Sequence, residues 1–447
     1  MAQKFSAPRG TQDLLPQDSY KWRFLERRLM EIAEAYGYRE IRIPTFEHTE
    51  LFIRSVGEST DVVGKEMYTF EDKGGRSITL RPEGTAGTVR AAIEHGLLAG
   101  AMPLRLCYLL SCFRYEKPQA GRLREFHQFG VECFGAADAA ADAELIHLAG
   151  NILSGVGVRD LSLEINSIGC PTCRKAYLEK LRTYFQSHYD ELCDTCKGRL
   201  ETNPLRILDC KSPVCKAICE GAPVIVDSLC DDCKEHFRRL QEYLTAMDMP
   251  FTVNPHIVRG LDYYTRTVFE FVSGQIGAQG TVCGGGRYDG LVEEMGGNPT
   301  PGLGFGMGLE RLMLVLEAQG VELPAQPTCD VYLAGIGDAA SRRAFLLAQE
   351  LKEDGLHAQS DLCGRGLKAQ MKYADKIGAK YAVVLGDEEL QSGTANLKNM
   401  LTGETTQVPI DGIGAAVTDG IMDRTLDEMT DDVDKEALSK LFGGMMK

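Results

Sequence analysis

The stretch from Cys112 to Gly135 constrains the fold of this chain more than any other. An apolar run breaks into a polar loop and then returns to alternation, which predicts a β-hairpin with a long exposed tip. Residues two apart share one face of a strand, so Arg114 and Glu116 pair on the incoming strand and Gln128 and Glu132 on the outgoing one. Because an unpaired buried charge is costly, charged side chains on an inward face indicate a site.

Arg114 is suited to a phosphate, since its planar guanidinium makes bidentate, charge-assisted hydrogen bonds. The alternative is a surface ion pair between Arg114 and Glu116 on a hairpin at the edge of a sheet. This stretch taken alone fits both interpretations.

Length and charge narrow the class of protein. The chain has 447 residues and a net charge of −15. That length predicts two to four domains, and the acidic balance argues against indiscriminate nucleic-acid binding, which depends on neutralising phosphates. There is no apolar run of about 18 residues and no hydrophobic signal segment at the N-terminus, so we expect a cytoplasmic protein.

The N-terminal part predicts a helix, a strand and a second helix start. Apolar residues recur at helical spacing from Trp22 to Tyr36, and the alternating strand 39–44 follows. Pro44 cannot donate to a ladder, which favours an edge or an interface for this strand. Glu83 and Thr85, where the second helix begins, are placed to receive an ammonium group. The alternative is that they only stabilise the helix start.

The segment from Gly169 to Leu244 carries nine of the fifteen cysteines. In a long cytosolic chain such cysteines indicate free thiols or metal rather than disulfides. Two C-x-x-C pairs suffice for a closed tetrahedral zinc site. The alternative is a set of buried thiols without metal. For a possible structural zinc ion, the expected ligands are Cys193, Cys196, Cys230 and Cys233.

Glycine-rich segments follow the cysteine-rich part. Residues 258–265 bring a cation, a carboxylate and two tyrosines close to a glycine, and three successive glycines stand at 284–286. In residues 302–308 glycine alternates with apolar residues, so one face of that strand has no side chains and a flat ring could lie on it. Arg311 could then cover the ring by guanidinium stacking.

After a short linker, residues 328–411 predict a small α/β domain. Lys368, Lys372 and Lys376 fall on one helix face, with Arg365 just ahead of them. That stripe could track a nucleic-acid backbone, and a solvated helix face would look the same. The acidic tail beyond the domain is assigned no function, and a short helix near 437–442 is considered there.

The order of these segments is specific. The units 37–47, 113–126 and 304–311 resemble the three motifs of class II aminoacyl-tRNA synthetases. Residues 259–264 and 284–289 resemble the two histidine-specific motifs of the histidyl-tRNA synthetase family. The resemblance covers nearly the whole chain.

The resemblance implies an α+β fold: a class II synthetase antiparallel sheet flanked by helices, with a helical insertion and a C-terminal α/β anticodon-binding domain. We expect the catalytic core at 1–168 and 246–323, the cysteine-rich insertion at 169–245, the anticodon-binding domain at 328–411 and an acidic tail at 412–447. The first motif of this class builds a dimer interface, so a homodimer is expected.

The resemblance also implies a reaction. L-histidine attacks ATP to give histidyl-adenylate, and the acyl group then passes to the 3′ end of tRNA(His), with Mg²⁺ bridging the phosphates. The alternative is a catalytically silent, synthetase-like regulatory subunit of histidine biosynthesis. The presence of the phosphate-binding arginines and of the last domain argues against that alternative.

Residue roles follow from the matching motif positions. The residues implied as catalytic are Arg114 and Arg259. Those implied to bind ATP are Arg114, Glu116, Arg122, Phe126 and Arg311. Those implied to bind histidine are Glu83, Thr85, Gln128, Glu132, Arg259, Tyr263 and Tyr264, above a floor of Gly304 and Gly306. Those expected to meet tRNA are Arg124, Arg365, Lys368 and Lys372.

Overall fold

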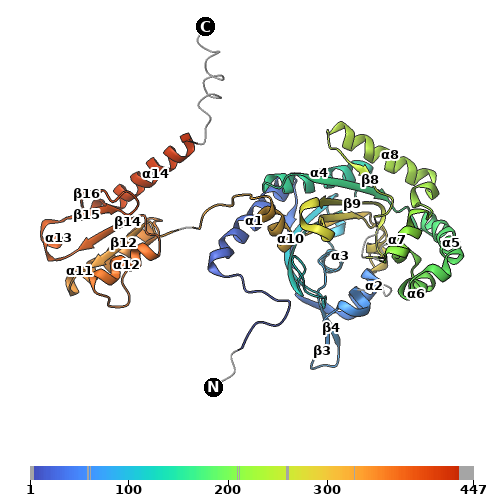
Figure 1. The fold of residues 1–447 in the computed structure, drawn as a ribbon, viewed down its shortest axis with the longest axis horizontal. Helices are drawn as coiled ribbons and strands as arrows, with labels where there is room; N and C mark the ends of the chain where they lie inside the picture. Colours follow the sequence, from blue (N-terminus) through green and yellow to red (C-terminus); the bar gives the residue numbers. More distant parts are fainter. Residues whose placement is uncertain are drawn as a thin grey trace, which may run out of the picture. The chain divides into compact units, whose positions relative to one another are not determined.

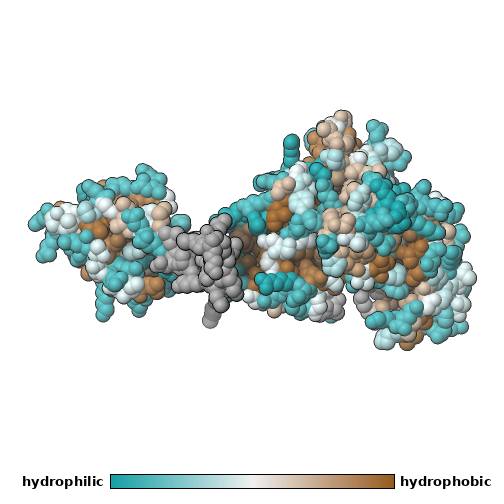
Figure 2. Space-filling view, turned by 90° about the horizontal axis from the view of Figure 1, so that it is seen from above, coloured by the Kyte–Doolittle hydropathy of each residue, from teal (hydrophilic) through white to brown (hydrophobic). Residues whose placement is uncertain are grey.

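The computed structural model describes residues 5–57, 60, 62–208, 210, 212–257, 261–326 and 328–431, without the side chains of 277–279 and 425–431. The chain divides into two compact units, Met1–Pro324 and Ala325–Lys447 (Figure 1). In the space-filling view both units present a largely hydrophilic surface with scattered hydrophobic patches (Figure 2). Among the described helices, none is long and apolar enough to cross a membrane.

The first unit is built on an eight-stranded sheet whose interior strands are antiparallel, as predicted. Only the outermost strand at each edge pairs in parallel. The predicted strand 39–44 is shortened to two residues, and it lies at an edge, as Pro44 indicated. In spatial order the strands are β1 (Arg39–Glu40), β5 (Leu104–Phe113), β6 (Glu125–Phe134), β11 (Gly302–Gly308), β10 (Thr281–Arg287), β9 (Thr265–Ser273), β7 (Leu161–Ser167) and β8 (Thr252–Val253).

One face of this sheet is covered by α1 (Pro16–Ala35), α4 (Ala139–Gly155) and α10 (Leu309–Ala318), together with the last helix of the insertion described below. The apolar stripe of α1 is buried, including Leu25 and Leu29, and it packs in the same core as Phe129 and Phe305 from the strands. Alternation in the strands therefore sends the large apolar residues toward the helices and leaves the opposite face for the site.

A buried ion pair crosses this covered face. Arg287, at the end of β10, is fully buried and bonds to Asp142 of α4, which also accepts from His236 at 3.2 Å. Burial acts to raise the pKa of Asp142, but the Arg287 charge and the His236 bond lower it to about 2. Because loss of one partner would strand a buried charge, Arg287 fixes β10 against α4 and the insertion helix that carries His236.

On the other face lies a three-stranded sheet, β2 (Phe46–His48), β4 (Ser77–Leu80) and β3 (Thr69–Glu71), accompanied by α2 (Thr49–Val56), α3 (Thr85–Glu94) and α9 (Leu291–Glu294). The hairpin between β3 and β4 turns at Gly75, whose φ of 73° favours glycine.

The insertion runs from β7 to β8 and is helical, as expected. Its helices are α5 (Pro171–Ser187), α6 (Asp194–Thr202), α7 (Pro213–Glu220) and α8 (Asp231–Ala246), drawn in green in Figure 1. It has a core of its own, formed by Tyr177, Leu181, Phe185 and several cysteines. Leu240 and Leu244 of α8 instead enter the core of the main sheet, so α8 ties the insertion to the unit that carries it.

The second unit is a five-stranded sheet in the order β13-β12-β14-β15-β16, with helices α11 to α14. The predicted strands and helices are present, and α13 (Asp387–Ser392) was not predicted. The bounds are β12 (Val331–Gly335), α11 (Asp338–Glu353), β13 (Ala358–Ser360), α12 (Leu367–Lys376), β14 (Tyr381–Leu385), β15 (Thr394–Asn399), β16 (Thr405–Pro409) and α14 (Ile413–Asp431).

The expected start of a separate tail at residue 412 is wrong. Helix α14 begins at Ile413 and continues the second unit, and Ile413 and Val417, one turn apart, are buried in its core. The acidic composition of the later residues hid this short apolar stripe. The short helix considered near 437–442 lies outside the described residues.

Candidate active site

A cavity of about 470 Å³ lies on the face of the central sheet that α1, α4 and α10 leave uncovered. Its lining comes from segments that are far apart in the sequence: the start of α3, the β5–β6 hairpin, the tyrosine pair before β9, and the strands β10 and β11. The described residues predicted to bind ATP or histidine line this cavity, except Glu132; Arg124 and the candidate zinc ligands lie outside its lining.

The floor of the cavity has almost no side chains. Gly304 of β11 pairs with Glu132 on one side and Gly286 on the other, while Gly306 pairs with Gly130 and Gly284. A Cβ at Gly304 would collide with the Glu132 carboxylate, and a Cβ at Gly306 would collide with the Gln128 amide. These positions therefore require glycine for space as well as for flatness.

Glu132 lies at the rear of the site, 1% exposed. Its carboxylate accepts hydrogen bonds from the hydroxyls of Thr85 at 2.8 Å, Tyr108 at 2.9 Å and Tyr288. Burial raises the pKa of Glu132 to about 8, although these three donors act to lower it. A buried carboxyl group held by three hydroxyls is fixed in position and ready to bind a polar group.

Tyr108 and Tyr288 were missed by the sequence reasoning. Tyr288 follows directly after the glycine run and Arg287, inside a segment already singled out, so its place in that segment was the available signal. No signal in the sequence pointed to Tyr108, because a tyrosine at this position looks like any other apolar residue of a strand. Its ring lies where a Cβ on Gly84 or Gly130 would be, so it fills the space between α3 and β6.

Glu83 is buried where α3 begins. Its carboxylate accepts from the backbone N–H groups of Thr85 at 2.6 Å and Ala86 at 2.9 Å. The helix-start interpretation is therefore confirmed for Glu83, whereas the Thr85 hydroxyl donates to Glu132. Burial raises the pKa of Glu83. A carboxylate has lone pairs beyond these two bonds, and Glu83 lines the cavity, so its role toward an ammonium group stays a prediction.

The β5–β6 hairpin brings cations to the cavity. It lies inside the sheet rather than at its edge, and Arg114 lies 4.0 Å from the buried Glu116 carboxylate, so the two residues are paired but not on the surface. The Arg114 Nε donates to the Pro82 carbonyl at 2.8 Å, and its guanidinium carbon lies 5.3 Å from the centre of the Phe126 ring. Arg122 in the loop forms an ion pair with Glu116, which is largely buried.

Arg311 enters from the opposite wall, at the junction of β11 and α10. Its Nη1 donates to the Thr281 carbonyl at 2.6 Å, and its side chain lines the same cavity as Phe126. The neighbouring Glu310, also missed from the sequence, accepts from the backbone N–H and from Nδ1 of His127, both at 2.9 Å. Glu310 thereby ties the start of α10 to β6.

Tyr263 and Tyr264 line the remaining side of the cavity. The Tyr263 ring centre lies 4.7 Å from that of Tyr264 and 5.6 Å from that of Tyr288. Arg259, predicted to act at the phosphate, lies outside the described residues.

The residues expected to meet tRNA fall into two groups. Arg124 is packed into the hairpin: its guanidinium carbon lies 3.8 Å from the centre of the Tyr115 ring. Arg365 is likewise held by the fold, 4.3 Å from the Tyr373 ring centre and paired with Asp361. Lys368, Lys372 and Lys376 are exposed on α12, as predicted, with Gln370 and Ala374 on its buried side.

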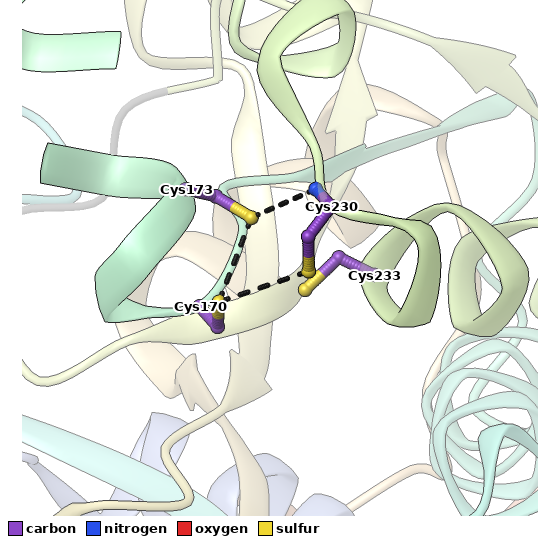
Figure 3. Close-up of side chains that lie close together, drawn as sticks. All are labelled: Cys170, Cys173, Cys230 and Cys233. Carbon is purple, nitrogen blue, oxygen red and sulfur yellow. Dashed lines mark hydrogen bonds between the residues drawn. The ribbon is translucent and has the colours of Figure 1, made fainter. Parts of the chain in front are cut away.

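The expected zinc ligand set is wrong. The cysteine pairs at 193/196 and 230/233 belong to two different clusters. Spacing along the chain could not show this, because the pairing depends on how the insertion helices fold back. The clusters are Cys170, Cys173, Cys230 and Cys233 (Figure 3), and Cys193, Cys196, Cys210 and Cys215.

The cavity thus joins arginines to carboxylates over a flat, bare floor. Arg114, Arg122 and Arg311 suit an anion, a strip of glycines suits a planar ring, and the buried Glu132 suits a polar group. This antiparallel sheet, with a cation-bearing hairpin and a glycine strand leading into a helix, is the catalytic architecture of class II aminoacyl-tRNA synthetases.

Comparison with known proteins narrows the class. The sequence profile described as histidyl-tRNA synthetase matches residues 10–177 and 222–312, and that of an anticodon-binding domain matches 330–419. The chain belongs to the histidyl-tRNA synthetase family. Members of this family use ATP and Mg²⁺.

Individual relatives cover nearly the whole chain. It is 58% identical to the histidine–tRNA ligase of Caldanaerobacter subterraneus subsp. tengcongensis, over 92% of this chain and 99% of that protein. It is 55% identical to that of Acetivibrio thermocellus, over 91% and 97%. The crystal structure of apo S. aureus histidyl-tRNA synthetase superposes with a TM-score of 0.79 at 41% identity, covering 93% of this chain and all of that one.

The floor gives a direct test. Replacing Gly306 by Ala would drive a methyl group into the Gln128 amide and into the cavity. We expect ATP-dependent pyrophosphate exchange to fall at least about tenfold while the melting temperature changes by a few degrees at most. Gly198→Ala, where a Cβ meets nothing within 4 Å, is the matched control. Unchanged exchange by Gly306→Ala would show that the strip of glycines is not required for the activity of the site.

Proposed function

We propose that the chain activates L-histidine with ATP to give histidyl-adenylate and pyrophosphate, and then transfers the histidyl group to the 3′ end of tRNA(His). The observation that carries this proposal is the single cavity in which three arginines and a bare glycine floor adjoin the buried, hydroxyl-bound Glu132. Such a cavity accommodates a nucleotide and a small polar side chain side by side.

The nucleotide takes the half of the cavity lined by the hairpin and β11. Adenine stacks between Arg311 and Phe126, with an edge toward the glycine strip, and Glu116 accepts from its exocyclic amine. Stacking on an arginine and an aromatic ring suits a flat base. Arg122 leaves Glu116 to bind the outer phosphates, since the loop that carries it is part of the exposed hairpin tip.

Histidine takes the half that is lined by Glu83, Gln128 and the tyrosines, with Glu132 buried behind it. Its ammonium group meets Glu83, Thr85 and Gln128, and its imidazole meets Glu132 and Tyr264 beside Tyr263. An apolar side chain could not form the further hydrogen bond that Glu132 and Tyr264 offer to the imidazole, so apolar amino acids are rejected.

The chemical step is in-line attack of the histidine carboxylate on the α-phosphorus of ATP, with pyrophosphate leaving. Both reactants are anionic, so the main demand on the protein is to neutralise charge as it develops. Arg114 and Arg259 carry this role. Mg²⁺ supplies further positive charge to the phosphates, and the Glu270 carboxylate, on the cavity wall, is an oxygen ligand of the kind it takes.

A regulatory subunit without catalysis is not favoured. The chain is 58% identical over nearly its whole length to a histidine–tRNA ligase, and it retains the anticodon-binding domain. Arg114, Arg122 and Arg311 all line the one cavity. We further infer that the protein acts in the cytoplasm, where protein synthesis takes place, and that cysteines of the insertion bind zinc.

Tyr288→Phe tests the histidine subsite. Loss of one hydroxyl donor leaves the buried Glu132 carboxyl group less firmly held, and such a hydrogen bond is worth about 0.5–1.5 kcal/mol. In pyrophosphate exchange measured with each of the twenty amino acids, we expect histidine alone to support exchange by the native chain. The variant should show a KM for histidine raised severalfold, with the KM for ATP unchanged.

The control is Tyr177→Phe, whose hydroxyl donates to the Pro223 carbonyl within the insertion, and which should behave as the native chain. Exchange driven equally well by another amino acid would contradict the proposed substrate. A normal histidine KM in Tyr288→Phe would contradict the assignment of this subsite.

The exposed lysines of α12 are proposed to contact tRNA. Replacing Lys368, Lys372 and Lys376 together by Ala removes three cations from one helix face, so the KM for tRNA in aminoacylation should rise severalfold while exchange is unaffected. Arg342→Ala with Lys352→Ala, two exposed cations on α11, is the control. If the triple variant charges tRNA normally, the stripe is only a solvated helix face.

A homodimer is proposed from the small sheet. Phe46 and Phe70 are 56% and 47% exposed, and their pairing with Leu80 and Ile78, two apart on β4, places them on one face. Replacing both phenylalanines by Asp should change the sedimenting mass from dimer to monomer. The control replaces Phe345 and Leu346, similarly exposed on α11, by Asp. A native chain that sediments as a monomer would end this proposal.

A further inference from the structure

Eight of the nine cysteines in the insertion form two compact clusters of four. In each cluster all four sulfurs lie within 4.8 Å of one another. The neck cluster, Cys170, Cys173, Cys230 and Cys233, joins the first helix of the insertion to the last one (Figure 3). The tip cluster, Cys193, Cys196, Cys210 and Cys215, joins α6 to the segment that leads into α7.

The distances between the cysteine sulfurs match those of tetrahedral zinc coordination and not those of disulfide bonds. A tetrahedral zinc ion with Zn–S bonds of about 2.3 Å holds its sulfurs about 3.8 Å apart. The sulfurs of Cys170 and Cys173 are 3.5 Å apart, those of Cys170 and Cys230 are 4.0 Å apart, and those of Cys193 and Cys210 are 3.8 Å apart. A disulfide would require about 2.05 Å.

The surroundings of the sulfurs also favour thiolates. Cys170, Cys193 and Cys230 each immediately precede a helix, where the helix dipole stabilises negative charge. Backbone N–H groups donate to sulfur in both clusters, from Cys230 to Cys173 at 3.0 Å and from Cys193 to Cys215 at 3.3 Å. Such outer bonds orient metal-bound thiolates.

The neck cluster is linked to the active site through Arg174, the residue after Cys173. Arg174 Nη1 donates to the backbone carbonyl of Asp262 at 3.2 Å, and Nη2 donates to that of Tyr264. Tyr263 and Tyr264 line the active-site cavity. The backbone next to Cys170 is also bonded to the start of β9: the Arg266 N–H donates to the Gly169 carbonyl at 2.9 Å.

We propose that the insertion binds two zinc ions, each through one of these clusters, and that the ion at the neck positions the loop carrying Tyr263 and Tyr264. The neck ion fixes the first turn of α5, and Arg174 transmits that position to the loop. Arg174 is thus a positioning residue. The tip ion only stabilises the far end of the insertion.

The metal content of the purified full-length chain, measured by plasma mass spectrometry, tests the first part of the proposal, that the insertion binds two zinc ions. We expect two zinc ions per chain. The double variants Cys170→Ser with Cys173→Ser, and Cys193→Ser with Cys196→Ser, should each retain one. Native protein without zinc, or with iron in its place, overturns the sites. This measurement does not depend on the proposed reaction.

Histidine-dependent pyrophosphate exchange tests the second part of the proposal, that the neck ion positions the loop carrying Tyr263 and Tyr264. This part rests on the proposed function. The neck variant should raise the KM for histidine at least fivefold with little change in the KM for ATP, and the tip variant should leave both unchanged. Arg174→Ala should retain both zinc ions and raise the KM for histidine as the neck variant does. This second variant still tests the positioning role if the neck variant unfolds.

A normal histidine KM in Arg174→Ala overturns the positioning role. So does a tip variant that raises the KM as far as the neck variant does. Native protein that binds two zinc ions but supports no histidine-dependent exchange would instead refute the proposed function and leave the two metal sites standing.

Discussion

The site depends on a strip of β-sheet that carries no side chains. Gly304 and Gly306 leave the central strand open, and the groups that crowd against them, the Glu132 carboxylate and the Gln128 amide, occupy the space that a Cβ would take. One requirement therefore produces two results. The strip keeps further side chains out of the cavity, and it lets the Glu132 carboxyl group and the Gln128 amide from the neighbouring strand fold over the sheet.

Burial of Glu132 is tolerable because its partners come from three separate segments. Thr85 begins α3, Tyr108 is in β5 and Tyr288 follows β10, and all three hydroxyls converge on one carboxyl group. The covered face of the sheet contains its own buried charges in the Arg287–Asp142 pair. Two adjacent residues, Arg287 and Tyr288, thus fix β10 to a helix on one face and complete the site on the other.

Local pattern predicted much of this structure. Alternation predicted the β5–β6 hairpin, alternating glycines predicted the bare face of β11, and helical spacing predicted α1 and the exposed lysines of α12. Each of these features is encoded within a few consecutive residues. The same is true of the edge position of β1, which a single proline indicated.

The missed features depend on contacts between distant segments. Tyr108 looked like an ordinary strand residue until the register placed it beside Gly130. The cysteines were paired wrongly because sequence spacing does not show which helices of the insertion return to its neck. Helix α14 was taken for a tail because its acidic composition outweighed Ile413 and Val417, whose burial depends on the sheet beneath them.

A crystal structure of the chain with L-histidine and a non-hydrolysable ATP analogue tests the central claim most directly. The account predicts an adenine ring stacked between Arg311 and Phe126 with an edge toward the glycine strip, the imidazole within hydrogen-bonding distance of Glu132, and the α-phosphate beside Arg114. A nucleotide bound away from the glycine strip, or an imidazole that does not meet Glu132, would contradict it.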